Sequence, residues 1–277
     1  MQIDAHQHFW QPARGDYDWM PRDNALLCRP YAPADLAPQL AAAGVAATVL
    51  VQAAATVEET EYMLGIADAT PFVAGVVGWV DFQNPAQAHV IKRLSGHPKF
   101  KSLRPMIQDI PDDGWMLRED VQWAYRALID HGLSFDALGF PRHLDNFLTL
   151  LRRYPELPVV IDHGMKPQIR THTEQSFKTW AEGMARLAEA GAYVKLSGLV
   201  TEAAPDWRPE RLAPYVNHLI EAFGADRIMW GSDWPVCRLA ADYARWHEVA
   251  LALTAHLPHA DHARIFGGTA AAFYRIP

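Results

Sequence analysis

The chain has 277 residues, half of them hydrophobic, which is enough to bury the core of one large domain. Its formal net charge is -7 and its pI is near 6.0, and its Lys and Arg residues form no basic stripe, so nucleic-acid binding is not expected. No apolar run reaches the roughly 18 residues of a membrane helix, and no leader is visible. Cys28 and Cys237 cannot build a disulfide framework. We therefore expect a cytoplasmic protein that binds neither nucleic acid nor membrane.

Short apolar segments recur along the chain and are the predicted strands. Several are apolar nearly throughout, as strands buried on both faces of a parallel sheet are. The eight segments are residues 3–8, 47–52, 72–80, 101–107, 134–138, 159–163, 193–197 and 228–233.

Longer helix-like segments separate these strands. Residues 34–43 are rich in Ala and Leu and end at Gly44, a typical helix stop. Thr56-Val-Glu-Glu is a capping box that opens the next helix, and Asn84-Pro85 combines a cap with a first-turn proline. Further helices are predicted over 118–131, 143–154, 177–190, 209–223 and 240–255, with a short Ala-rich helix at the end. Residues 10–31 are irregular and are expected to form a loop over one end of the domain.

Eight strand–helix units predict a single (β/α)8 TIM barrel over residues 1–277. The alternative is an open doubly wound sheet, which calls for a Gly-rich phosphate turn after the first strand. His6 and His8 stand at that place instead. In a barrel, functional side chains gather at the C-terminal ends of the strands, so the residues that end each strand become the candidates.

The predicted strand ends carry titratable side chains. His6 and His8 lie two apart on the first strand, so they share a face and could bind a metal or hold a polarised carbonyl. Taken alone, this pair also fits two surface histidines near a chain end. The later strand ends add Arg104 on the fourth strand, His163 and Lys166 on the sixth, Lys195 on the seventh and Asp233 on the eighth.

Three motifs together resemble a known family. His-x-His on the first strand, Asp-His-x-x-Lys-Pro on the sixth and Gly-Ser-Asp-Trp-Pro on the eighth are similar to the amidohydrolase superfamily. Within it they resemble the sugar-lactonase group of the amidohydrolase-2 branch. The opening Ile-Asp-Ala-His-Gln-His-Phe-Trp and the Val-Lys-Leu-Ser-Gly segment strengthen the match, which spans the whole chain. The resemblance implies hydrolysis of a small sugar-acid lactone, such as L-fuconolactone, to its aldonate.

The resemblance also implies a site. In metal-dependent relatives, the residues matching His6, His8, His163 and Asp233 hold one divalent ion, for which zinc is the first expectation. In some lactonases of this branch the same residues act on the substrate without a required metal, so the need for a metal stays open. The fifth predicted strand carries Asp136 instead of a histidine, and no lysine is a candidate for carbamylation beside a second histidine. A two-metal centre is therefore not expected.

Lactone opening needs a nucleophilic water, a polarised carbonyl and a proton for the leaving ring oxygen. Asp233 is the candidate general base. His6, His8 and His163, with or without Zn²⁺, would stabilise the oxyanion. One alternative is a metal-dependent decarboxylase of the same branch, which would want more basic residues than Arg104. A second alternative is a catalytically inactive sugar-binding barrel. Loss of His163 or Asp233 would have supported it, but both residues are present.

Other side chains have two interpretations each. Arg104 either donates to substrate oxygens or closes the barrel in an ion pair. Trp10, Trp79 and Trp234 either line an apolar face for a sugar ring or pack in the core. Lys166 is a weaker substrate-binding candidate, Lys195 is expected to support the site, Asp162 to point away from His163, and Cys237 to be no nucleophile. The histidines expected at the surface are His143, His172, His218, His247, His256, His259 and His262.

Overall fold

Each strand pairs in parallel with the next one along the chain, and the eight together form a barrel. The protein is described by a computed structural model that covers residues 1–277. The strands are β1 (Gln2–Gln7), β2 (Val45–Val51), β3 (Val73–Gly78), β4 (Phe100–Leu103), β5 (Ser134–Ala137), β6 (Val159–Ile161), β7 (Tyr193–Leu196) and β8 (Ile228–Trp230). All eight predicted strands are present, and the predicted (β/α)8 barrel is confirmed.

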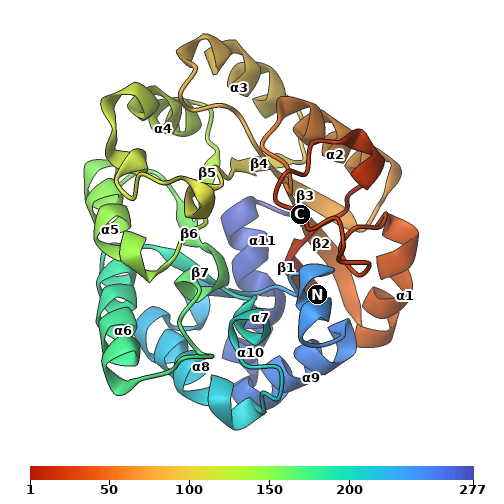
Figure 1. Cartoon of the computed structure of the whole chain (residues 1–277), viewed down its shortest axis with the longest axis vertical. Helices are drawn as coiled ribbons and strands as arrows, with labels where there is room; N and C mark the ends of the chain where they lie inside the picture. The colour runs from red at the N-terminus through yellow and green to blue at the C-terminus, as the bar shows by residue number, and fades with distance from the viewer.

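Helices form a ring around the strands (Figure 1). Thr56 accepts a hydrogen bond from Glu59 N at 3.1 Å at the start of α2, and Gly44 ends α1 with φ 69°, as their types predict. The outer helices are α1 (Pro33–Ala43), α2 (Val57–Ala69), α3 (Ala88–Ser95), α4 (Gln122–Asp130), α5 (Leu144–Arg153), α6 (Glu174–Glu189), α8 (Pro209–Phe223) and α9 (Tyr243–Thr254). Shorter helices are α7 (Leu199–Glu202), α10 (His259–Ala263) and α11 (Thr269–Tyr274). Of these, α7 and α10 were not predicted, because one turn is too short to show a period. No helix has the length and apolarity needed to cross a membrane.

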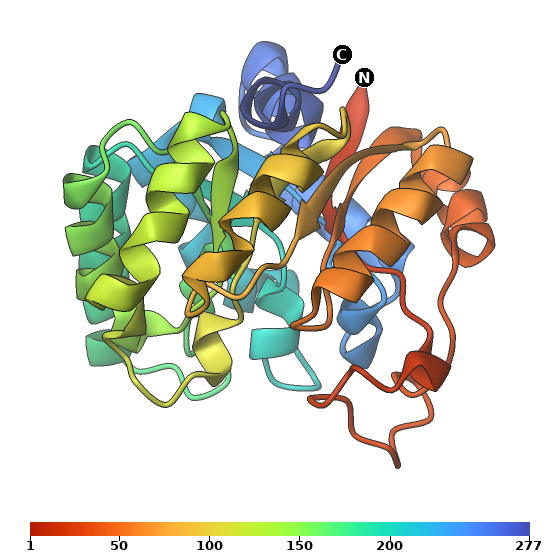
Figure 2. The same cartoon turned by 90° about the horizontal axis from the view of Figure 1, so that it is seen from above.

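The two ends of the barrel interior differ in chemistry. At one end α11 lies near both chain termini, and Phe273 and Tyr274 pack against apolar residues of the strands (Figure 2). The loop that follows β1 extends from the opposite end (Figure 2). Towards that opposite end the buried side chains are polar or charged, among them His6, Asp162 and Lys195. The helix α11 thus closes the N-terminal end of the barrel, and the polar end is left for a site.

The barrel closes through residues that follow β8. Asp233 N donates to His6 O at 2.7 Å, and His8 N donates to Trp234 O at 2.7 Å. Gly231 lies where this segment runs beside β1, and a Cβ built on it would approach His6 Cβ to 2.7 Å. A side chain does not fit there, so glycine permits the close approach that sets Asp233 beside the histidines.

Two histidines expected at the surface are buried, and that prediction was wrong for them. His143 Nδ1 accepts from Phe140 N at 3.0 Å at the start of α5, and the residue is fully buried. His247 lies on the inner side of α9 against Trp230, with Nε2 3.0 Å from Gln2 Oε1. An imidazole has an apolar body and a polar edge, so it packs in a core where one partner satisfies it.

We expect Gly231→Ala to lower the free energy of unfolding by about 1–3 kcal/mol, because the added methyl group would overlap the His6 side chain. The matched control is Gly65→Ala within α2, where a Cβ meets nothing within 4 Å. That change should raise stability by about 0.4–1 kcal/mol. Urea unfolding of both variants measures the two effects, and equal stabilities would contradict the steric account.

Burial lowers the pKa of His247 from its ordinary value of 6.5, and the nearby His262 adds to the shift. The unfolded chain therefore binds a proton at a higher pH than the native protein, and stability falls as the pH drops below about 6.5. We expect His247→Gln to reduce this acid-side loss, as measured by urea unfolding at about pH 7 and about pH 5. The exposed His256→Gln is the control, and identical pH slopes in both variants and the parent would contradict the assignment.

Candidate active site

A cavity of about 220 Å³ opens at the C-terminal end of the barrel. It is lined from the loops that follow several different strands, as expected for a barrel site. The lining residues are His8, Trp10, Trp19, Ala53, Arg104, Met106, Gln108, Leu138, His163, Lys166, Asp233 and Val236. His6 is fully buried beneath them.

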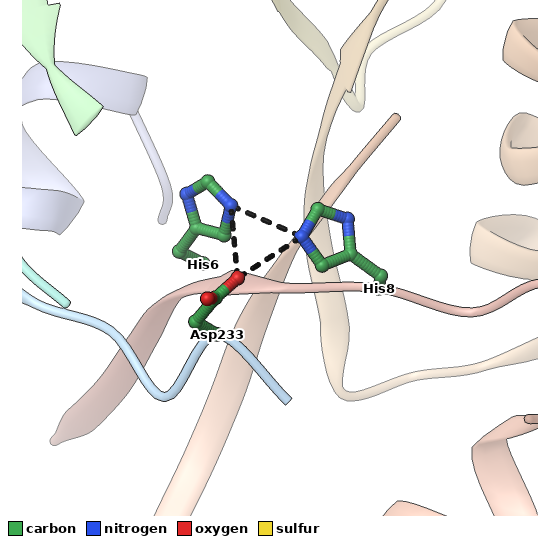
Figure 3. A group of neighbouring side chains, drawn as sticks. All are labelled: His6, His8 and Asp233. Carbon is green, nitrogen blue, oxygen red and sulfur yellow. Dashed lines mark hydrogen bonds and ion pairs between the residues drawn. The ribbon is translucent and has the colours of Figure 1, made fainter. Parts of the chain in front are cut away.

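Three of the predicted residues form a triangle of ligand atoms (Figure 3). His6 Nε2 and His8 Nε2 lie 3.2 Å apart. Asp233 Oδ1 lies 3.3 Å from His8 Nε2 and 3.7 Å from His6 Nε2. His163 Nε2 lies 3.9 Å from the same carboxylate oxygen. The structure therefore brings together all four residues that the strand ends indicated, although they come from opposite ends of the chain.

The backbone that carries these residues is strained. After β6 ends at Ile161, the φ angles are 54° at His163, 61° at Met165 and 48° at Lys166, and Asp233 after β8 has φ 57°. A left-handed backbone costs energy at a residue other than glycine, and residues in this conformation are concentrated at functional sites. The turn also brings Asp162 to 3.5 Å from His6 Nδ1. The expectation that Asp162 points away from His163 was wrong. Asp162 faces the barrel interior as Val160 does, and the left-handed backbone at His163 turns that ring to the same side.

A buried set of charges lies under the histidines. Lys195 Nζ donates to Asp136 Oδ2 at 2.5 Å and lies 3.0 Å from Asp162 Oδ1. Arg104 donates to Asp162 Oδ2 at 3.2 Å, and the Tyr274 hydroxyl donates to Asp136 Oδ2 at 2.7 Å. Burial works against the charge on Asp162, but Lys195, His6 and Arg104 keep its pKa well below the ordinary value. Sequence reasoning missed Asp136 as a partner of Lys195, although both are charges within strands that are otherwise apolar.

The pKa values of Asp233, His163 and His6 all lie below their ordinary values. Burial opposes ionisation of Asp233, but the neighbouring His163, His8 and His6 hold its pKa below the ordinary value. Burial lowers the pKa of His163 to about 4, against the pull of Asp233. The pKa of His6 is also well below its ordinary value, because of burial and the charge of Lys195. At neutral pH the site therefore holds a carboxylate beside the neutral imidazoles of His6 and His163.

The outer nitrogen of each ring is held by the protein. His8 Nδ1 lies 2.7 Å from Val51 O, and His163 Nδ1 lies 2.8 Å from Ser197 Oγ. These contacts orient the rings so that both Nε2 atoms face Asp233. The sequence offered no signal for Val51, since any residue has a carbonyl group.

The predicted substrate-binding residues lie in different places. Arg104, Trp10 and Lys166 line the cavity, with Lys166 donating to Gln108 Oε1 at 2.6 Å. Arg104 also pairs with Asp162. It therefore lines the cavity, as a substrate-binding residue would, and forms an ion pair inside the barrel, as the alternative interpretation held. Sequence reasoning did not find Gln108, which no motif marks.

Two of the predicted tryptophans are not brought to this cavity. Trp79 lines a neighbouring groove of about 800 Å³, which shares Trp19 and Met106 with the cavity. Trp234 is buried, with its ring centroid 5.0 Å from that of Tyr31, and it packs in the core as the alternative interpretation held. Cys237 is buried as well, and burial raises the pKa of its thiol well above the ordinary value.

The donor set fits one divalent ion. The ligand atoms of His6, His8 and Asp233 lie within 4.8 Å of one another, and nitrogen and oxygen ligands at such spacing suit Zn²⁺. His163 falls in a second group with His6 and Asp162. His6 belongs to both groups. Its Nε2 faces Asp233 in the first group, and its Nδ1 faces Asp162 in the second.

Proteins of known identity resemble this chain over its whole length. It is 45% identical over 279 residues to an L-fucono-1,5-lactonase of Burkholderia ambifaria, which covers 99% of this chain and 95% of that protein. An L-fucono-1,5-lactonase of Burkholderia multivorans is 34% identical, over 100% of this chain and 97% of that protein. The crystal structure of a Burkholderia multivorans amidohydrolase with bound zinc superposes with a TM-score of 0.95 at 32% identity, over the full length of both chains. The amidohydrolase family model matches residues 3–276, and the chain therefore belongs to the amidohydrolase family.

Proposed function

We propose that this protein is a carboxylic ester hydrolase that opens a sugar-acid lactone to its aldonate, with L-fucono-1,5-lactone as the first candidate substrate. The observation that carries the proposal is the ionised Asp233 held among imidazoles at the floor of a cavity of about 220 Å³. A cavity of that size suits one small ring. Similarity to two L-fucono-1,5-lactonases supports the substrate class. A cytoplasmic location belongs to the same proposal.

Asp233 is positioned to act on water. Its carboxylate accepts a proton from the water molecule as the water oxygen bonds to the lactone carbonyl carbon. The tetrahedral intermediate collapses when the bond from carbon to ring oxygen breaks, and the proton held by Asp233 passes to that oxygen. The histidine rings supply hydrogen bonds to the oxyanion that forms in between. No proton or electron is left over, and the product is the ring-opened acid.

A divalent ion is compatible with this assignment. His6, His8 and Asp233 would hold it, and the zinc in the crystal structure of a related amidohydrolase supports zinc as the first choice. Such an ion would polarise the carbonyl group and lower the pKa of a bound water.

The remaining walls suit a polyol with an apolar face. Trp10 offers an aromatic surface, and Lys166 and Gln108 offer polar groups at the rim. Arg104 lines the same cavity, and its guanidinium group can donate to a substrate oxygen. Arg104 already pairs with Asp162, which leaves Lys166 as the cavity's unpaired cation. This is fewer basic groups than the decarboxylase alternative calls for.

We expect Asp233→Asn to lower kcat for lactone hydrolysis by about 100- to 10,000-fold, because general-base catalysis contributes that much. A pH-indicator assay with L-fucono-1,5-lactone and its stereoisomers measures the loss, and circular dichroism checks that the barrel still folds. Near-normal hydrolysis by the variant would remove Asp233 from the mechanism. No hydrolysis of any aldonolactone by the parent protein would overturn the lactonase assignment and favour the decarboxylase.

We expect Lys166→Met to lower kcat/KM by about 10- to 100-fold, which is what a hydrogen bond to a charged group contributes. The loss should lie mainly in KM, since Lys166 lines the cavity but is not one of the three residues of the His6–His8–Asp233 triangle. Lys178→Met on the outside of α6 is the matched control, because its ammonium group is exposed. Unchanged kinetics in Lys166→Met would show that the substrate does not reach this side chain.

A further inference from the structure

A groove of about 800 Å³ adjoins the cavity at the same end of the barrel. Its lining comes from the loops that follow β1, β2, β3 and β4, so it belongs to the end where barrel enzymes bind their substrates. Trp19 and Met106 line both spaces and form the border between them. The cavity of about 220 Å³ suits one small ring, and the proposed reaction leaves the groove without an occupant.

Aromatic side chains supply much of the apolar surface of the groove. Trp19 and Trp79 are half-buried, and Phe82 and Trp115 are buried behind them. A sugar ring has an apolar face of C–H groups, and a partly exposed indole can cover such a face. The groove therefore offers the kind of surface on which a second sugar ring packs.

Hydrogen bonds and packing hold these aromatic residues in place. Thr60 Oγ1 accepts from Trp79 N at 2.8 Å and donates to Trp79 O at 3.1 Å. The indole of Trp19 donates to Ala53 O at 2.5 Å, and the indole of Trp115 donates to Gln83 Oε1 at 3.1 Å. A surface that is already ordered loses little conformational entropy when a ligand binds.

The charged side chains that line the groove are all acidic. They are Asp16, Asp18, Asp81 and Asp109, and no Lys, Arg or His residue lines it. Asp16 pairs with Arg14 at 2.7 Å, whereas the other three carboxylates form no ion pair. A carboxylate only accepts hydrogen bonds, so these groups suit the hydroxyl donors of a sugar and repel an anion.

The shared border favours a sugar over an organic cation. Carboxylates and aromatic faces would also suit a cation. A substituent on a lactone seated in the cavity, however, reaches the groove past Trp19 and Met106. One ligand then fills both spaces, and binding energy gained in the groove can be used at the reacting carbonyl group.

We propose that the groove is a subsite for a second, neutral sugar ring, so that lactones of disaccharide acids are substrates and those with an acidic second ring are poor ones. The proposal rests on the proposed lactonase function and extends its substrates from one ring to two. The reaction at Asp233 stays the same, because the second ring contributes binding and no chemistry.

The first experiment compares lactones with one and two rings. Each test lactone keeps the single ring that the parent protein hydrolyses fastest and carries a neutral glycosyl group on one of its hydroxyl groups. We expect kcat/KM for the best of these to exceed that of the single-ring lactone by about 10-fold, as stacking on an aromatic residue contributes. No gain with any position of the glycosyl group would overturn the proposal.

Trp79→Ala tests the groove itself. We expect this variant to reduce the ratio of kcat/KM for the two-ring lactone to that for the single-ring lactone to about one, because the ring loses its aromatic surface. Phe177→Ala is the matched control, since Phe177 is a half-buried aromatic residue on α6 that lines neither space. An unchanged ratio in a folded Trp79→Ala, as judged by circular dichroism, contradicts the proposal. If the variant does not fold, the ratio in the parent protein decides.

A lactone whose second ring is a uronic acid tests the charge of the groove. We expect its kcat/KM to lie about 10-fold below that of the neutral analogue, and to rise by about 2- to 5-fold in Asp18→Asn, which removes one repelling charge and keeps an acceptor. Asp130→Asn at the end of α4 is the control, because Asp130 lies outside the groove. Equal rates for the neutral and acidic lactones would contradict the role of the carboxylates.

Isothermal titration calorimetry separates this inference from the proposed function, because it measures binding without hydrolysis. The probes are methyl glycosides of single sugars and of neutral disaccharides, with choline as an organic cation. If no lactone is hydrolysed but a disaccharide binds and Trp79→Ala weakens it, the sugar subsite stands and the lactonase assignment fails. If lactones are hydrolysed but a second ring adds nothing, the lactonase assignment stands and this inference fails. Choline binding that Trp79→Ala weakens, with no disaccharide binding, would overturn the inference in favour of a cation site.

Discussion

The barrel interior must neutralise charges that water cannot reach, and Lys195 is the residue on which that balance depends. It lies between Asp136 and Asp162, and Arg104 pairs with Asp162 from the other side. Two cations therefore meet two carboxylates in a region of low dielectric, where removing one partner would leave an uncompensated charge. His6 contacts this set through Lys195 and Asp162, which do not line the cavity, so its orientation depends on groups beneath the substrate site.

The division of the barrel into two ends explains how such a polar layer is tolerated. At the N-terminal end the strands enclose apolar side chains, and α11 covers them with Phe273 and Tyr274. The Tyr274 hydroxyl reaches upward to Asp136. One helix thus provides both apolar packing and a hydrogen bond to the charged layer. The hydrogen bonds to Asp136 and to Asp162 Oδ2 offset part of the cost of burying this layer, whereas Asp162 Oδ1 and Arg104 Nε are buried without a hydrogen bond.

Much of the site could be predicted from the sequence, because the C-terminal ends of parallel strands meet at one end of a barrel. Any barrel topology brings His6, His8, His163 and Asp233 together once their strands are recognised. The prediction failed at residues whose placement depends on backbone outside the strands. Asp162 and His163 share the barrel interior because the left-handed backbone at His163 turns its ring to the side that Val160 and Asp162 already face. Trp234 packs in the core because the segment after β8 pairs in parallel with the end of β1.

Local patterns were enough to predict the eight strands, most of the outer helices and the residues at the strand ends, because apolar periodicity and capping chemistry are local properties. The direction in which each ring nitrogen points, the contact of Lys195 with His6 and the burial of His143 and His247 are known from the packed barrel alone. Those facts depend on distances between side chains that lie far apart along the chain. A local sequence pattern does not contain these distances, because they are set by side-chain packing after the barrel has closed.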